Sequence, residues 1–212
     1  MADLVLKALL AYLLGSVSGS MVMGAIRHVD IRQSGSGNAG GTNAFRTQGF
    51  RFALGVVLID IGKGVLAAWL VPRLPLPFSA TEAGAAAVML TCGFAAVAGH
   101  CYPVWYGFRG GKGAATAVGA LLVIQPLALL PMIATWLLVL VVTGWVGLAT
   151  ILAALSLVPA IAWLDGIGAN LLFAVLLALF VVFTHRSNIS RMAAGTENRF
   201  EKVRIVNWFG GR

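Results

Sequence analysis

Residues 114–164 read AATAVGALLVIQPLALLPMIATWLLVLVVTGWVGLATILAALSLVPAIAWL, a stretch of about 50 residues without a charged side chain. A membrane-spanning helix needs about 20 mainly apolar residues, so this stretch holds either two long helices or three short ones. Breaks are expected at residues 125–126, at Pro131 and at residues 143–145, because Pro and Gly interrupt helices. The choice between two and three helices decides on which side of the membrane the C-terminal tail lies.

Four further apolar segments cover residues 4–26, 52–71, 83–99 and 169–184. Apolar residues make up 59% of the chain and charged residues only 10%, whereas a soluble domain has roughly 25% charged residues. The expected fold class is therefore all-α, a polytopic membrane helix bundle. The first segment is longer than the core of a signal peptide, which favours a retained span, and its Lys7 is close enough to one end to reach the interface.

The basic residues choose between the two arrangements through the positive-inside rule. With residues 27–51 in the cytosol, three helices in the long stretch bring the other basic segments to the same side, whereas two helices would place the basic tail outside. The cytosolic side then carries Arg27, Arg32, Arg46, Arg51, Arg109, Lys112, Arg186, Arg191, Arg199, Lys202, Arg204 and Arg212, and the opposite loops carry only Arg73. We therefore expect seven transmembrane helices, an extracytoplasmic N-terminus and a cytosolic C-terminus. Residues 1–212 are expected to form a single domain, with cytosolic segments at 27–51, 102–113, 143–147 and 185–212.

The composition also argues against two classes of protein. A net charge of +8 would suggest a nucleic-acid partner in a soluble protein, but the apolar content makes the basic residues topology signals and anion contacts instead. Cys92 and Cys101 are the only cysteines, so neither a disulfide framework nor a CxxC metal site is expected. We predict no metal and no cofactor.

A glycine-rich run, SGSGNAGGTN, occupies residues 34–43 and is followed by Arg46. Glycines allow successive backbone N–H groups to point into one concavity that holds an anion, and Arg46 would add a positive charge. A flexible linker is the alternative. The recurring hydroxyl and amide side chains favour a binding loop, whose candidate residues are Ser36, Gly37, Asn38, Gly40, Thr42 and Asn43.

A second glycine-rich run, GGKGAAT, occupies residues 110–116 on the same expected side and opens directly into a helix. Its N–H groups would add a helix N-terminus to an anion site. The run is not a Walker A loop, because Tyr106 and Gly113 stand where that motif needs Gly and Ser or Thr. The candidate residues are Gly110, Gly111, Lys112 and Gly113, and they favour phosphate binding without an NTP-driven motor.

The third polar cluster begins at the end of the last span. His185 and Asn188 are three residues apart, so they share a face if the helix continues past the membrane boundary, and they could reach an anion held by the two loops. Arg186 and Arg191 are better explained as topology anchors. Thr150 supplies a hydroxyl near the cytosolic start of the sixth span.

Two ionisable residues, Asp60 and Lys63, lie within the second span and can pair on one helical face. Intramembrane charges point to function by default, but a structural ion pair is an equally open alternative. His100 precedes a helix end and is expected to hydrogen-bond the backbone of the loop that follows rather than bind a metal. The small residues in Gly15-x-x-x-Gly19 and Ser20-x-x-x-Gly24 predict close helix packing.

Together these motifs resemble a known family. The segments GSGNAGGTN (35–43), GHCYP (99–103) with GGKGAAT (110–116), and HRSNISR (185–191) are similar, in order and spacing, to the three cytosolic motifs of the bacterial acyl-phosphate:glycerol-3-phosphate acyltransferases, the PlsY family. The Asp60-x-x-Lys63-Gly64 element is also similar. One departure lies at the start of the sixth helix, where the family often has a Ser-rich run and this chain has Gly147 and Thr150.

The resemblance implies a seven-helix enzyme of the bacterial inner membrane with its active site facing the cytosol. The enzyme would transfer a fatty acyl group from acyl phosphate to the 1-hydroxyl of sn-glycerol 3-phosphate. The products would be lysophosphatidic acid and inorganic phosphate, as the first step of phospholipid synthesis. It would work as a monomer among membrane lipids. The implied catalytic residues are Ser36, Arg46, Lys112, His185 and Asn188, and the implied substrate contacts also include Lys63 and Thr150.

Acyl phosphate is already activated, so positioning and charge stabilisation suffice and a strong protein nucleophile is unnecessary. The His-x-x-x-x-Asp pair of other glycerolipid acyltransferases is absent, because Gln33, Trp105 and Ser190 stand five residues after the three histidines. We therefore expect direct transfer, with His185 binding phosphate. A transporter or channel for phosphate or an organic anion is the alternative, although transporters place their sites at the midplane between repeated halves.

Overall fold

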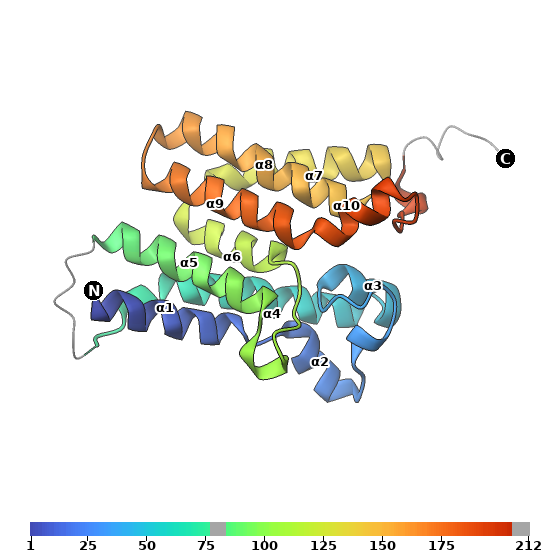
Figure 1. Cartoon of the computed structure of the whole chain (residues 1–212), viewed down its shortest axis with the longest axis horizontal. Helices are drawn as coiled ribbons and strands as arrows, with labels where there is room; N and C mark the ends of the chain where they lie inside the picture. Colours follow the sequence, from blue (N-terminus) through green and yellow to red (C-terminus); the bar gives the residue numbers. More distant parts are fainter. Residues whose placement is uncertain (77–83, 205–212) are drawn as a thin grey trace. The chain divides into compact units, whose positions relative to one another are not determined.

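The computed structural model describes residues 1–76 and 84–204, which form helices and loops in two compact units, residues 1–124 and 125–212 (Figure 1). The first unit contains α1 (Ala2–Gly15), α2 (Gly19–Arg27), η1 (Ile31–Gln33), α3 (Gly41–Gln48), α4 (Phe50–Trp69), η2 (Val71–Arg73), α5 (Ala85–Cys101), η3 (Val104–Tyr106) and α6 (Ala114–Ile124). The second contains η4 (Pro126–Ala128), α7 (Leu129–Thr143), α8 (Val146–Asp165), α9 (Ala169–Thr184), α10 (Arg186–Ala193) and η5 (Glu201–Val203).

Helix α4 is the centre of the first unit and contacts α2, α3, α5 and α6, while α1 packs along α5. Glycines allow the closest of these contacts. A Cβ on Gly64 would overlap the carbonyl of Thr116 on α6, and a Cβ on Gly119 would overlap the carbonyl of Ile61 on α4. Two helices that meet at glycines on both sides gain dispersion energy over their whole backbones, which is how helices associate in lipid.

The contact between α1 and α5 has the same character, because a Cβ on Gly15 would overlap the Ala96 carbonyl of α5. A Cβ on Gly19 would likewise lie only 2.5 Å from the Val56 carbonyl oxygen of α4. The predicted packing role of the Gly15-x-x-x-Gly19 pair is therefore confirmed. Gly24 instead faces the carbonyl of Val29 in its own loop, so its small size serves a turn rather than a helix contact.

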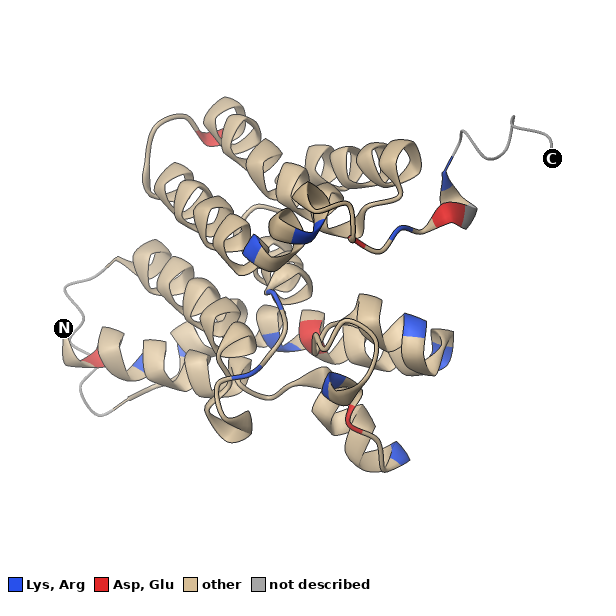
Figure 2. Ribbon diagram, turned by 45° about the vertical axis from the view of Figure 1, so that its right-hand side comes forward, with Lys and Arg blue, Asp and Glu red and all other residues tan. Residues whose placement is uncertain are grey.

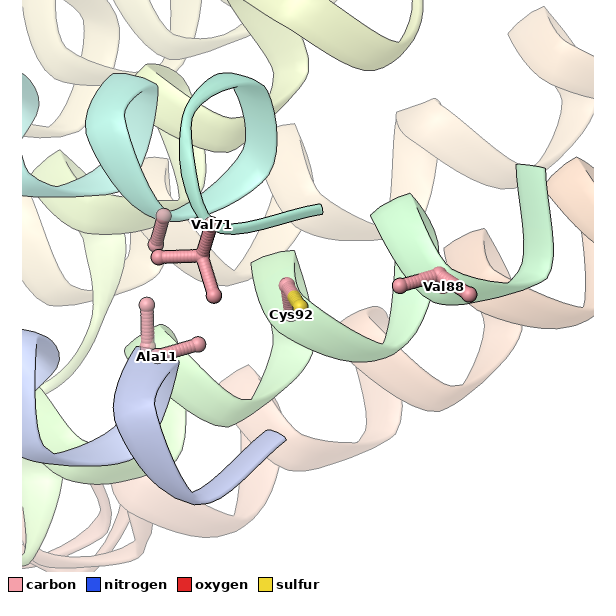
Figure 3. Packing of buried hydrophobic residues seen from close by; sticks show 6 residues of the cluster. Ala11, Val71, Val88 and Cys92 are labelled. Atoms are coloured by element: carbon pink, nitrogen blue, oxygen red, sulfur yellow. The ribbon is translucent and has the colours of Figure 1, made fainter. Parts of the chain in front are cut away.

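A small-residue core joins the ends of α1, α4 and α5 in the first unit. Figure 3 shows Ala11, Val71, Val88 and Cys92 converging there. At the same end Lys7 is buried, lies 3.1 Å from Asp3 and donates to the Pro72 carbonyl at 3.0 Å. Lys7 therefore pairs inside the bundle, where an acid one turn away offsets its charge, instead of extending to the interface as predicted.

The second unit is a layer of three helices with α8 between α7 and α9 (Figure 1). The chain then bends by 52° between α9 and α10. After α10, Phe200 donates its N–H to the Gly144 carbonyl at 2.8 Å, and the Arg199 guanidinium lies 4.4 Å from the Trp145 ring centroid. The start of the tail therefore packs on the turn between α7 and α8, while the rest of the predicted tail, residues 205–212, lies outside the described residues.

The long apolar stretch forms three helices, α6, α7 and α8, with breaks at the two positions expected near residues 125 and 144. Pro131 lies in the first turn of α7, where its missing N–H costs no hydrogen bond, so the helix is not interrupted there. Among the described residues five helical segments are long and apolar enough to cross a membrane, and the bent pair α9–α10 would make six. Helix α6 has 11 residues and is shorter than a full span.

Candidate phosphate-binding and catalytic site

The first glycine-rich loop is folded around the side chain of Asn43, which is buried at the start of α3. Its Oδ1 accepts the N–H of Ser36 at 2.9 Å, and its Nδ2 donates to the carbonyls of Ile31 at 2.9 Å and Ser34 at 3.1 Å. Gly35 has φ +62° and passes so close to Asn43 that a Cβ would overlap Oδ1. Glycine is therefore required here, and the loop has a fixed shape unlike a linker.

This arrangement exposes the predicted ligand groups of the loop. Ser36 and Gly37 lie at the exposed tip, with Asn38 and Gly40 partly covered, and Thr42 and Arg46 follow on α3. Both polar atoms of Asn43 bind the backbone of its own loop, and its Oδ1 holds the N–H of Ser36. Its contact with substrate stays a prediction.

The second loop is fixed to the end of α5. Gly110 donates its N–H to the carbonyl of Cys101 at 3.2 Å, and Gly111 donates to the carbonyl of His100 at 3.1 Å. Gly113 has φ +90°, and a Cβ there would lie 2.8 Å from a methyl carbon of Val97. Lys112 is thus held between two immobilised glycines, two residues before the N-terminus of α6, where N–H groups favour an anion.

Arg32 joins the two loops within the first unit. Its Nη1 donates to the Tyr106 carbonyl at 3.3 Å, while Nε and Nη2 bind the carboxylate of Asp30 at 3.0 and 2.8 Å. The hydrogen bonds from Arg32 hold the pKa of Asp30 below its ordinary value, and the same pairing raises the pKa of Arg32. A cavity of about 650 Å³ opens here, lined by Gly37 from the first loop and Arg109 from the second.

A buried polar network lies below the second loop. The ammonium of Lys63 donates to the Val17 carbonyl at 2.7 Å and to His100 Nδ1 at 2.9 Å, and lies 3.0 Å from Asp60 Oδ1. The same carboxylate oxygen accepts the N–H of Gly19 at 3.0 Å. These partners account for all three donors of Lys63. Its side chain is 3% exposed and its contacts here are protein groups, so a contact of Lys63 with substrate stays a prediction.

The second unit places His185 at the bend between α9 and α10. Its Nδ1 lies 2.8 Å from the Val181 carbonyl, and because a carbonyl only accepts, Nδ1 carries a hydrogen and donates it. The helix does not continue straight through this point as expected, since α9 ends at Thr184. A turn keeps the pair adjacent nonetheless, because the N–H of Asn188 donates to the His185 carbonyl at 2.8 Å.

Asn188 is oriented by Glu197, to which sequence reasoning assigned no role. Its Nδ2 donates to Glu197 Oε1 at 2.7 Å, and Arg191 Nε donates to Glu197 Oε2 at 2.7 Å. Gly147 of α8 faces the same amide, and a Cβ there would lie 2.7 Å from Asn188 Nδ2. The glycine that departs from the Ser-rich family pattern therefore makes room for Asn188.

The chain matches the family model described as glycerol-3-phosphate acyltransferase over residues 5–195. The chain belongs to this family. A glycerol-3-phosphate acyltransferase of Symbiobacterium thermophilum is 47% identical over 94% of this chain and 96% of its own length. One of Chlorobaculum parvum is 40% identical over 89% and 93%.

Two solved structures extend the likeness to the fold of this acyltransferase family. Both are of PlsY (YgiH), described as an integral membrane glycerol 3-phosphate acyltransferase, in a glycerol 3-phosphate form and a lysophosphatidic acid form. They superpose with TM-scores of 0.82 and 0.81 at 33% and 32% identity, each covering 96% of this chain and 98% of the other. The chain is therefore a multi-pass integral membrane protein of the PlsY fold.

Thr150 of this acyltransferase lies on α8. Its hydroxyl donates to the Val146 carbonyl at 2.9 Å within α8 and accepts the indole N–H of Trp136 at 3.2 Å. Both contacts are within the second unit, and they use the hydroxyl to join α7 to α8. The contact of Thr150 with substrate stays a prediction.

Within the first unit the structure brings Ser36, Gly37, Gly110 and Lys112 onto two loops that Arg32 joins. Sequence reasoning gave Arg32 only a topology role, and its spacing of two from Asp30 was the available signal for the ion pair. For His100, the expected side-chain contact with the loop backbone is wrong: its carbonyl accepts the N–H of Gly111, whereas its ring contacts Lys63 and Asp60 of α4.

Proposed function

We propose that this chain transfers a fatty acyl group from acyl phosphate to the 1-hydroxyl of sn-glycerol 3-phosphate, releasing lysophosphatidic acid and inorganic phosphate. The observation that carries the proposal is the family match over residues 5–195, which spans both compact units and supports one acyltransferase domain. The relatives' names supply the acceptor, and the lysophosphatidic acid form of the solved structure is consistent with the product.

The chemistry of the first unit fits an enzyme whose two substrates both carry phosphate. Ser36 at an exposed loop tip, Arg46 on α3 and Lys112 before α6 supply a hydroxyl and two positive charges, and glycine backbones leave room for a bulky anion. Transfer from a mixed anhydride needs the reactants held in line and the leaving phosphate stabilised. We assign this work to Ser36, Arg46 and Lys112, with Gly37, Asn38, Gly40, Thr42, Gly110, Gly111 and Gly113 as further substrate contacts.

His185 and Asn188 complete the proposed catalytic set from the second unit. His185 donates from Nδ1 to the Val181 carbonyl, which fixes the orientation of the ring. The Asn188 amide is fixed by Glu197. Both side chains are therefore pre-oriented, which suits groups that bind a phosphate or a hydroxyl and does not require a covalent acyl-enzyme.

The membrane placement extends the proposal. We assign seven transmembrane helices with the N-terminus outside, the C-terminus inside and the active site facing the cytosol of a bacterial inner membrane. The four arginines of the second unit that the structure describes lie at the end formed by α10 and the following chain, where Figure 2 shows the blue segments. Such a one-sided distribution is what the positive-inside rule favours at a cytosolic end. The protein is expected to act as a monomer among membrane lipids.

The test is acyl transfer by purified protein reconstituted in vesicles. Acyl phosphate with glycerol 3-phosphate should yield equal amounts of inorganic phosphate and lysophosphatidic acid, and parallel reactions with acyl-CoA and acyl-carrier-protein should yield neither. Release of phosphate without acylated product would contradict the proposal, as would uptake of glycerol 3-phosphate into the vesicles without turnover. A trapped acyl-enzyme would contradict direct transfer.

A further inference from the structure

We propose that Asp60, Lys63 and His100 form a positioning network that sets the location of Lys112 and thereby the affinity of this acyltransferase for the phosphate of glycerol 3-phosphate. The inference rests on the proposed function for its substrate. It gives a role to three buried ionisable residues that the proposed chemistry does not use. It also explains why the second loop contains glycines, because their backbone packs directly against His100.

The network draws its members from separate elements of the first unit. Asp60 and Lys63 lie on α4, His100 lies near the end of α5, and their backbone partners Val17 and Gly19 lie at the break between α1 and α2. Side-chain exposure is 1% for Asp60 and 3% for Lys63 and for His100. A single change in this network therefore alters groups held by three helices.

Stability alone is a poor reason for such a network. Removing two charges from water costs about as much as their attraction returns, so an apolar substitute would hold these helices together at least as well. The α4–α6 and α1–α5 contacts already achieve close packing through glycines. A buried ion pair inside a membrane bundle is instead expected to serve the site next to it.

His100 makes the physical connection to the loop. Its carbonyl accepts the N–H of Gly111, and a Cβ on Gly111 would overlap Nε2 of the imidazole ring. A Cβ on Gly110 would overlap the His100 carbonyl. The loop backbone therefore rests directly on this ring and on its peptide group, and the next residue is Lys112.

The imidazole ring of His100 is itself held by Lys63 and Asp60 of α4. Because the ammonium of Lys63 only donates, His100 Nδ1 accepts its hydrogen at 2.9 Å. Asp60 holds the Lys63 ammonium in place through the 3.0 Å ion pair. If the ring shifts, Gly111 must shift with it, and a displacement of about 1 Å at a substrate-positioning group can cost on the order of a hundredfold in rate.

The experiment compares His100→Phe, which keeps a ring but removes the acceptor, with Lys7→Met. The control is matched, because Lys7 also belongs to a buried ion pair of the first unit, 3.1 Å from Asp3, but at the end of α1 near Pro72. We expect His100→Phe to raise the KM for glycerol 3-phosphate at least tenfold with a smaller change in kcat. Lys7→Met should lower the thermal midpoint and leave KM within twofold. Equal KM changes in the two variants would overturn the proposal.

A double-mutant cycle separates positioning from general destabilisation. If His100 acts through Lys112, then His100→Phe should add little to the KM of Lys112→Met, because the group it positions is gone. Multiplicative effects would overturn the proposal. Should His100→Phe not fold, Asp60→Asn combined with Lys63→Met removes both charges at similar volume, and the same cycle applies.

A binding measurement keeps this inference separate from the proposed reaction. Glycerol 3-phosphate should protect Lys112 from an amine-reactive label in the reconstituted wild type, as read by mass spectrometry, and half-protection should need at least ten times more ligand in His100→Phe. Unchanged protection would sink the positioning role. A wild type that binds glycerol 3-phosphate but makes no lysophosphatidic acid would contradict the reaction and leave the positioning role in force.

Discussion

The side-chain oxygen of Asn43 accepts the backbone N–H of Ser36 at 2.9 Å, so a residue of α3 fixes the tip of the loop that precedes it. The same amide holds the carbonyls of Ile31 and Ser34. A polar loop thereby gains a defined shape from one buried side chain, and Ser36 lies exposed at its tip.

Asn43→Ala should abolish most acyl transfer. The change leaves two carbonyls and one N–H of the loop without their partner, at a cost of about 1–3 kcal/mol for each buried unsatisfied group. Thr47→Val is the matched control, because Thr47 lies one turn later on α3 and its hydroxyl only caps the Asn43 carbonyl at 2.9 Å. Initial rates in vesicles check both variants, and an Asn43→Ala rate within twofold of the wild type would contradict the loop's dependence on Asn43.

Gly64→Ala should destabilise the first unit, because its Cβ would overlap the Thr116 carbonyl where α4 meets α6. Overpacking of this kind costs about 1–3 kcal/mol. The control, Gly62→Ala, lies on the same helix with nothing within 4 Å of its added Cβ. It should be neutral or stabilising by up to about 1 kcal/mol through helix propensity. Thermal midpoints in detergent test the pair, and similar midpoints would argue against the close α4–α6 contact.

His185→Gln should retain far more turnover than His185→Ala if His185 binds phosphate through a hydrogen bond. The Gln amide nitrogen reaches the position of Nε2, although it gives up the bond from Nδ1 to Val181. Steady-state kinetics with acyl phosphate distinguish the two substitutions. Equal loss in both would instead indicate that the ring acts by taking up a proton.

Asp30→Asn should loosen the tie between the two loops at neutral pH, because Asp30 orients the guanidinium that binds the Tyr106 carbonyl. The pKa of Asp30 is lowered by its hydrogen bonds from Arg32, so the stabilisation is complete above the unfolded value of about 3.9 and is lost as the pH falls through the folded value. Hydrogen exchange of residues 104–110 should therefore be faster in the variant at pH 7. The two proteins should converge only below the folded pKa, and equal exchange at pH 7 would contradict the tie.

Much of the fold could be predicted because lipid imposes simple rules on length and charge. The distribution of the basic residues predicts three helices in residues 114–164, and the structure forms three helices there. The break between α1 and α2 was not predicted, because residues 15–19 are small and uncharged and contain no proline. The break is stabilised by distant partners, Asp60 and Lys63, which accept from Gly19 and donate to Val17.

The sequence motifs located the polar loops of the site, but they did not predict which protein groups each polar side chain contacts. Asn43, Lys63 and Thr150 have the polar groups of ligand-binding residues, yet each turns them toward protein atoms. Spacing along the chain cannot distinguish a side chain that faces substrate from one that supports the residue facing it. Glu197 illustrates the reverse error, since its contact with Asn188 depends on the chain folding back after α10.

The anchoring of residues 110–113 to α5 has a consequence for the catalytic cycle. A loop whose amides are bound to helix carbonyls and whose glycines rest on His100 and Val97 cannot swing over a bound molecule as a lid does. Glycerol 3-phosphate would then meet a preformed pocket, and its association rate should depend on diffusion and on ionic strength rather than on a conformational gate.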